Sequence, residues 1–162
     1  MARKTRGGPG GRLLPISALV LGLTAFTLGA APSAEAAANR CPTGPVRIAC
    51  VDLTHQTMWV QSHGRLIWGP VRIRSGAPHT PTRTGLKHIF RRARRHNSSI
   101  NGQPMPYSQF FDGGEALHGT RTPLRTPPGS LGCVTMKVSD AASLWNVTRM
   151  GDPVYVFGHR PR

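Results

Sequence analysis

Acidic residues are scarce in this sequence. Its 162 residues include 21 Lys and Arg but only 6 Asp and Glu, which gives a formal net charge of +15 at pH 7. A chain with this much positive charge attracts anionic surroundings. The densest basic run, residues 87–96, has one interpretation as a phosphate-binding patch. Because aromatic residues make up only 6% and no nucleic-acid-binding module is visible, we expect no specific nucleic-acid partner and favour a solvated basic surface.

Long hydrophobic runs are missing except for one near the start of the chain. A cationic head precedes an apolar run over residues 13–31, and a tail of small residues follows it. This three-part pattern is typical of a secretory signal peptide, with cleavage after Ala36 or Ala38. A transmembrane anchor is the alternative, because the run approaches the length of a bilayer span. A proline and two glycines inside the run favour cleavage, so we predict a signal peptide over residues 1–38, a secreted protein and no stable membrane span after cleavage.

Cysteine is rare as well, since only Cys41, Cys50 and Cys133 occur. Three cysteines in an exported chain leave at least one unpaired. Cys41 and Cys50 flank a turn-forming Pro-Thr-Gly-Pro sequence, and an oxidising compartment would let them form a disulfide that leaves Cys133 free. Bridges from Cys41 or Cys50 to Cys133 are the competing alternatives. No CxxC or HxxH ligand spacing is present, so we expect no metal and no cofactor.

The rest of the chain is long enough for one domain that buries its own core. We predict a short segment over residues 39–45, the domain over residues 46–158 and a C-terminal tail over residues 159–162. Short alternating runs between Gly and Pro turns predict strands. These strands cover residues 46–51, 57–61, 66–68, 71–74, 86–90 and 154–157. Many short strands with such turns indicate a mainly β fold, a β-sandwich or a small barrel-like fold.

One helix is predicted, over residues 139–147, shortly after Cys133. Ser139 is expected to be its N-cap, because a serine hydroxyl can accept a hydrogen bond from an unpaired N–H of the first turn. Asp140 would lie near the positive end of the helix dipole.

Residues 107–137 contain the chemistry that stands out. They include one histidine and one free-cysteine candidate, each beside a glycine, as His118-Gly119 and Gly132-Cys133. The gap between them holds three prolines and a glycine, which excludes a helix. It should be a loop that leaves one strand and returns, so that His118 and Cys133 meet in space. An imidazole can then take the proton of the thiol to make a thiolate nucleophile.

The alternative for each residue is structural. A lone cysteine is often a small buried hydrophobe, and a lone histidine is often an ordinary hydrogen-bonded residue. The glycines favour chemistry. Gly132 permits a tight turn before Cys133, so that neighbouring backbone N–H groups can face a developing oxyanion.

These residues resemble a known family. His118-Gly119-Thr120, followed by Ser-Leu-Gly-Cys-Val-Thr-Met over residues 130–136, is similar to the signature of YkuD-type L,D-transpeptidases. Residues 105–119 and 75–85 are similar to other segments of small members of that family, and the resemblance covers roughly residues 46–157. Two positions depart from the pattern. Leu131 stands where histidine is usual, which removes a second imidazole from the site, and Thr135 stands where Arg or Asn is usual, which affects substrate positioning.

The resemblance implies a role for each site residue. Cys133 is the nucleophile and His118 is the general acid and base, oriented by the backbone carbonyl of Gly119. Gly132 supplies the turn and a backbone oxyanion donor. The substrate-binding candidates are Tyr107, Ser130 and Thr135, and a turn-fixing role for Ser130 is equally open.

The resemblance also implies a substrate, namely peptidoglycan stem peptides. The expected reaction transfers a tetrapeptide acyl group through a Cys133 thioester, releases D-alanine and forms 3→3 cross-links, and carbapenem β-lactams should acylate the same cysteine. Hydrolysis of the thioester, an L,D-carboxypeptidase activity, is one alternative. A non-catalytic basic wall-binding module is another, favoured by Leu131 and Thr135. The positive charge would then suit a protein that lives among anionic cell-wall polymers.

Overall fold

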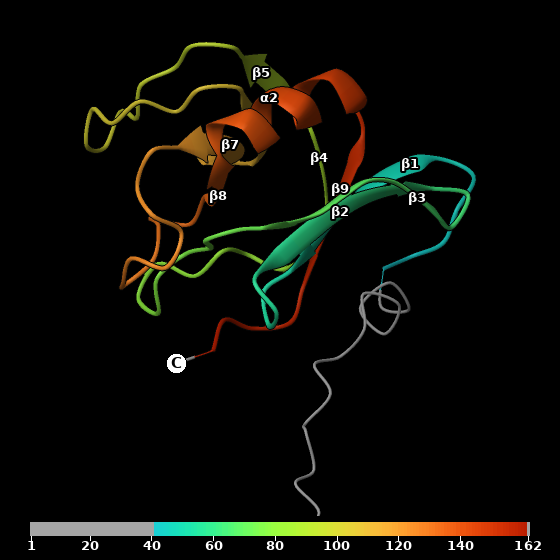
Figure 1. Ribbon diagram of the computed structural model, residues 1–162, viewed down its shortest axis with the longest axis horizontal. Coiled ribbons are helices and arrows are strands. Elements are labelled where there is room, and N and C mark those ends of the chain that lie inside the picture. The colour runs from blue at the N-terminus through green and yellow to red at the C-terminus, as the bar shows by residue number, and fades with distance from the viewer. Residues whose placement is uncertain (1–40, 162) are drawn as a thin grey trace, which may run out of the picture. The chain divides into compact units, whose positions relative to one another are not determined.

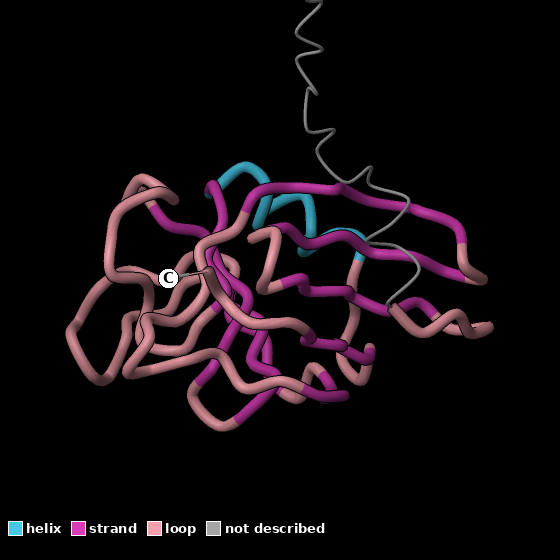
Figure 2. The backbone as a smooth tube through the Cα atoms, turned by 90° about the horizontal axis from the view of Figure 1, so that it is seen from below, coloured by secondary structure: helices cyan, strands magenta, loops and turns pink. Residues whose placement is uncertain are grey.

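The computed structural model of the chain describes residues 41–161 (Figure 1). The predicted signal peptide over residues 1–38 lies outside the described residues. Within the described part, no helix has the length and apolar character that crossing a membrane requires. Strands and loops dominate this part of the chain, and the one helix of the described residues lies among them (Figure 2). The predicted mainly β fold with one short helix after Cys133 is confirmed.

In the part of the chain that the structure describes, nine strands form two sheets. The first sheet has the order β3-β2-β1-β9-β4, in which β1 and β9 run parallel and all other neighbours antiparallel. Its strands are β1 (Arg47–Asp52), β2 (Thr57–Ser62), β3 (Arg65–Arg72), β4 (Gly85–His88) and β9 (Pro153–Phe157). The second sheet has the order β5-β6-β7-β8. Its strands are β5 (Arg91–Ala93), β6 (Ser108–Asp112), β7 (Glu115–Thr120) and β8 (Val134–Lys137).

One hydrophobic core joins both sheets and the helix. Buried residues of β1, β2 and β9 pack in the same cluster as Leu117 on β7, Val134 and Met136 on β8, and Ala141 and Leu144 on the helix. Burial of these side chains removes apolar surface from water, which is the main stabilising contribution to such a fold. The core therefore fixes β7 and β8, the two strands that carry the site, against the rest of the domain.

Helix α2 (Val138–Val147) follows β8 without a loop. Asp140 lies in its first turn as expected, but the N-cap is Lys137 and no side chain caps the helix. The prediction of Ser139 as N-cap is wrong, because the helix begins directly from the strand and Ser139 is already inside it. The helix packs closely on β7 at Gly119, where a Cβ atom would lie 3.0 Å from the Val138 Cα atom. Gly119 is thus required for the approach of α2.

Strand β3 differs from the prediction of two short strands separated by Gly69-Pro70. It runs unbroken from Arg65 to Arg72. Proline is tolerated because β3 lies at the edge of its sheet, where a missing N–H need not disrupt a ladder. Gly69 has φ +81°, and a Cβ atom there would lie 2.9 Å from the Met58 carbonyl oxygen. The two residues mark an irregularity within one strand, where the register with β2 shifts.

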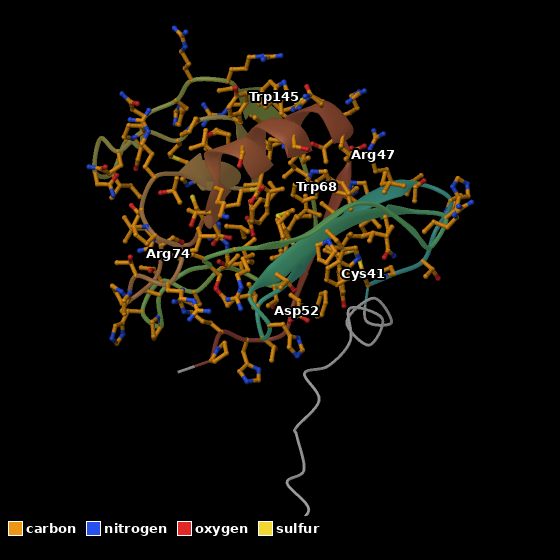
Figure 3. All side chains as sticks on the ribbon, in the orientation of Figure 1. Cys41, Arg47, Asp52, Trp68, Arg74 and Trp145 are labelled. Atoms are coloured by element: carbon orange, nitrogen blue, oxygen red, sulfur yellow. A yellow bond between two sulfur atoms is a disulfide. The ribbon has the colours of Figure 1, made fainter. Side chains whose placement is uncertain are left out.

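A disulfide joins Cys41 to Cys50 and so ties the segment before β1 to that strand. Both cysteines are buried in a small cluster with Trp59 and Phe157, and Cys41 is labelled in Figure 3. Cys133 is a free cysteine. The predicted pairing is confirmed, and the competing bridges to Cys133 do not form.

Candidate active site

The parallel pair β7 and β8 brings His118 and Cys133 together. In their register Leu117 is opposite Val134 and His118 is opposite Thr135. Cys133 directly precedes Val134, the first residue of β8. It therefore lies beside the residue that precedes Leu117 in β7. Residues 121–133, here called the crossover loop, leave the end of β7 and return to the start of β8 beside it (Figure 1). Both His118 and Cys133 line one cleft with a volume of about 740 Å³.

The imidazole of His118 is held in one orientation. The side chain is 7% exposed, and its Nδ1 atom lies 2.8 Å from the carbonyl oxygen of Gly119. A carbonyl oxygen can only accept a hydrogen bond, so Nδ1 carries the proton and Nε2 is left with a lone pair. This is the tautomer that a general base needs. The contact expected from the resemblance is present, and among the described residues no carboxylate contacts the ring.

The thiol of Cys133 is half-buried at the edge of a small apolar cluster with Met105, Phe110 and Ala116. Its Sγ atom lies 3.7 Å from the carbonyl oxygen of Gly114. Gly132 precedes it with φ +108°, a conformation that disfavours any residue with a Cβ atom. The tight turn that the sequence indicated therefore exists and presents the sulfur at the cleft.

Burial shifts the pKa values of His118 and Cys133 in the directions that favour their neutral forms. It lowers the pKa of His118, against the hydrogen bond to the backbone carbonyl, and nearby His96 lowers that pKa further. Burial likewise raises the pKa of the Cys133 thiol, against a backbone N–H, and the Glu115 carboxylate raises it further. The resting pair is therefore a thiol and a neutral imidazole. Proton transfer is then coupled to attack on the substrate, which is general-base chemistry.

Ser130 fixes the turn around Cys133. Its hydroxyl donates to the Cys133 carbonyl oxygen at 2.5 Å and accepts from the Gly132 N–H at 3.2 Å. The Gly132 N–H is thus occupied within the turn and is not the free oxyanion donor expected for it. No acceptor for the Cys133 N–H occurs in the part of the chain that the structure describes. The Cys133 N–H is therefore available to donate a hydrogen bond to a ligand.

Two of the substrate-binding candidates have structural contacts. Thr135 lines the cleft but is buried, and its hydroxyl donates to the Arg74 carbonyl oxygen at 3.0 Å. Tyr107 is outside the cleft lining, packed partly on the main core with its ring 6.1 Å from that of Trp145 on α2. The geometry assigns Tyr107 to packing rather than to the cleft.

The structure adds residues that the sequence did not single out. His96 lines the cleft and forms an edge contact with Phe110 at 5.1 Å, so the expectation that the site lacks a second imidazole is wrong. Arg74, labelled in Figure 3, donates from Nε to the Thr126 carbonyl oxygen at 2.9 Å and from its terminal nitrogen to Gly129, which holds the crossover loop. The only indication of His96 in the sequence is its place in the basic run of residues 87–96, and that run predicts a solvated surface.

The cleft has a positive lining. Arg74, Arg95 and Arg121 contribute to it, and no Asp or Glu does so within the described residues. The described chain also holds no group of three or more His, Cys, Asp or Glu side chains suited to a metal ion. A cleft of this charge favours an anionic ligand group such as a peptide carboxylate.

Comparisons with known proteins identify the family of this domain. A family model, the YkuD L,D-transpeptidase catalytic domain, matches residues 46–156. The chain belongs to this family. No curated protein matches the chain.

Several solved L,D-transpeptidases have a similar structure. One from Stackebrandtia nassauensis is 39% identical over 76% of this chain and 61% of that chain, with a TM-score of 0.71. A cysteine-to-serine mutant from Enterococcus faecium is 26% identical over 68% of this chain and 49% of its own, with a TM-score of 0.60. L,D-transpeptidase 3 from Mycobacterium tuberculosis, with a faropenem-derived adduct, is 21% identical over 72% and 62%, with a TM-score of 0.59, and supports the fold alone. The chain thus spans about three fifths or less of the first two proteins.

Proposed function

We propose that this protein is a peptidoglycan L,D-transpeptidase that forms 3→3 cross-links through a thioester on Cys133. One observation supports this most directly. The His118 Nδ1 atom is bound to the Gly119 carbonyl oxygen at 2.8 Å, which frees Nε2 in the same cleft as an unpaired thiol. Membership of the L,D-transpeptidase family supplies the substrate class for that pair.

The proposed reaction has two half-reactions. His118 Nε2 takes the Cys133 proton as the sulfur attacks the carbonyl of the peptide bond before the terminal D-alanine. The resulting oxyanion is stabilised by the Cys133 N–H. His118 then gives its proton to the leaving nitrogen, so D-alanine departs as an amine and a thioester remains. An acceptor amine attacks that thioester, loses a proton to His118, and releases the thiol with a new amide bond.

Cationic residues in the cleft suit the donor's free carboxylate. Arg121 lines the cleft in the crossover loop, and Arg95 lines it in the segment that also holds His96. An arginine guanidinium can bind a carboxylate through two parallel hydrogen bonds. The same positive character supports the proposal that the protein works among anionic cell-wall polymers after export by the signal sequence in residues 1–38.

Acylation by β-lactams follows from the same chemistry. A carbapenem presents a strained carbonyl to the thiolate and leaves a covalent adduct, because its ring opens without releasing a fragment. The M. tuberculosis protein above carries a faropenem-derived adduct, which motivates a β-lactam as the probe for this chain.

Product analysis tests the proposed function. Purified protein lacking residues 1–38 would be incubated with tetrapeptide-containing muropeptides, and the products separated by mass. Cross-linked dimers together with free D-alanine are expected, and Cys133→Ala should abolish both. Tripeptide without dimers would instead identify an L,D-carboxypeptidase. Unchanged substrate would favour a wall-binding protein without catalysis.

A further inference from the structure

Thr82 lies in the segment before β4 and is 4% exposed. Its hydroxyl oxygen stands between two backbone groups that are distant in sequence. The Gly76 N–H donates to Thr82 Oγ1 at 2.9 Å, and Oγ1 donates to the Gly132 carbonyl oxygen at 2.7 Å. Because the Gly132 oxygen can only accept, the hydroxyl proton points to it. Thr82 thus holds the Gly132 carbonyl group, next to the reactive Cys133, in a fixed position.

That carbonyl belongs to the same peptide unit as the Cys133 N–H. The unit is trans, since the cis peptide bonds of the described chain lie elsewhere, at Gly69-Pro70 and Pro127-Pro128. In a planar trans peptide the C=O and N–H bonds point in opposite directions. Holding the Gly132 oxygen on buried Thr82 therefore turns the Cys133 N–H away from the interior.

The Cys133 N–H, which is turned outward, is also the N–H that has no hydrogen-bond acceptor within the described residues. Ser130 occupies the Gly132 N–H and also binds the Cys133 carbonyl oxygen. The two peptide units that flank the Cys133 Cα atom are thus anchored separately, one by Thr82 and the other by Ser130. A preorganised N–H of this kind stabilises an oxyanion because no reorganisation is needed when charge develops.

We infer that Thr82 is a positioning residue for acyl transfer, which aims the Cys133 N–H at the oxyanion of the tetrahedral intermediate. This inference rests on the proposed function. Thr82 acts through the Gly132–Cys133 peptide and leaves the thiol and His118 unchanged. Its removal should therefore affect only reactions of Cys133 that develop charge on a carbonyl oxygen.

Two reactions of the same sulfur separate this role from a general structural one. Acylation by a carbapenem passes through an oxyanion, whereas alkylation by iodoacetamide displaces iodide and forms none. Thr82→Val removes the hydroxyl at nearly constant volume. We expect it to slow acylation by about 10- to 100-fold, less than the loss of an oxyanion donor outright, while alkylation stays within about twofold of wild type. With a peptide donor, kcat should fall and KM should change little.

Matched variants complete the test. Thr82→Ser keeps the hydroxyl and should restore most of the acylation rate, whereas Thr82→Ala, which also lacks the methyl group, should not. This pair decides the matter if the valine variant does not fold. Thr148→Val removes another fully buried hydroxyl, one bound to Gln109 and the Leu144 carbonyl oxygen, and should acylate like wild type.

The outcomes are distinguishable. An acylation rate in Thr82→Val equal to wild type, or equal losses in acylation and alkylation, would overturn the inference. So would a serine variant as slow as the alanine variant. A wild-type protein that alkylates but never acylates would instead contradict the proposed function.

Discussion

Replacing His118 by glutamine should expose how the thiol is activated. Glutamine is of similar size, but its neutral amide cannot accept the thiol proton as a base. Burial holds the pKa of Cys133 above the ordinary thiol value of 9.0. At pH 7 a thiol with a pKa of 9.0 is only about 1% thiolate, so the fraction in this protein is smaller still. Without a base, the variant must depend on that fraction.

Two measurable consequences follow. Carbapenem acylation at pH 7 should fall by about 10²- to 10⁴-fold, the usual contribution of a general base. The residual rate should rise about tenfold per pH unit, because it tracks the thiolate. Wild type should instead be nearly flat above neutral pH, since the lowered pKa of His118 keeps the imidazole unprotonated above and somewhat below the ordinary value of 6.5. Its rate should decline only in more acidic solution.

Stopped-flow or mass-resolved acylation between pH 5 and 9 would supply both profiles. The exposed His159 offers a matched control, because His159→Gln removes an imidazole outside the cleft and should leave the profile unchanged. A His118→Gln variant that keeps a flat profile, or loses less than about tenfold in rate, would refute a proton transfer between these two groups.

Three further predictions concern stability and the thiol. Gly119→Ala should lower the free energy of unfolding in urea by about 1–3 kcal/mol, because a Cβ atom would press on α2. Gly44→Ala is the control, since nothing lies within 4 Å of a Cβ atom there, and equal effects of the two substitutions would contradict the packing argument. Reducing the Cys41–Cys50 bridge should cost about 2–3 kcal/mol, and a melting temperature unmoved by dithiothreitol would oppose this. Glu115→Gln should lower the pKa of the neighbouring thiol, since the carboxylate raises it, and so speed iodoacetamide alkylation at pH 8; an unchanged rate would show that this charge is screened.

The sequence was informative where chemistry and local conformation coincide. The glycines beside His118 and Cys133 indicated a turn and a paired site, and the Pro-Thr-Gly-Pro sequence indicated the disulfide. Strands that lie between turn-forming residues, such as β1, β2 and β9, were predicted nearly in full. These features depend on residues close together in the chain.

Features that depend on distant contacts were not predictable in this way. Strand β7 has the sequence Glu-Ala-Leu-His-Gly-Thr, which contains few of the β-branched and aromatic residues that indicate a strand. Thr82 and Gly132 are 50 positions apart, and nothing local links them. His96 was hidden in a basic run that reads as surface, yet the fold places it in the cleft. The start of α2 was misplaced because a strand passes directly into the helix.

On the proposed mechanism, Cys133 forms an acyl-enzyme with the help of His118. The most direct test is intact-protein mass spectrometry after incubation with a carbapenem, followed by peptide mapping. One adduct per chain is predicted, located on the peptide that contains Cys133, absent from Cys133→Ala and formed far more slowly by His118→Gln. An unmodified protein, or an adduct on any other residue, would contradict the claim.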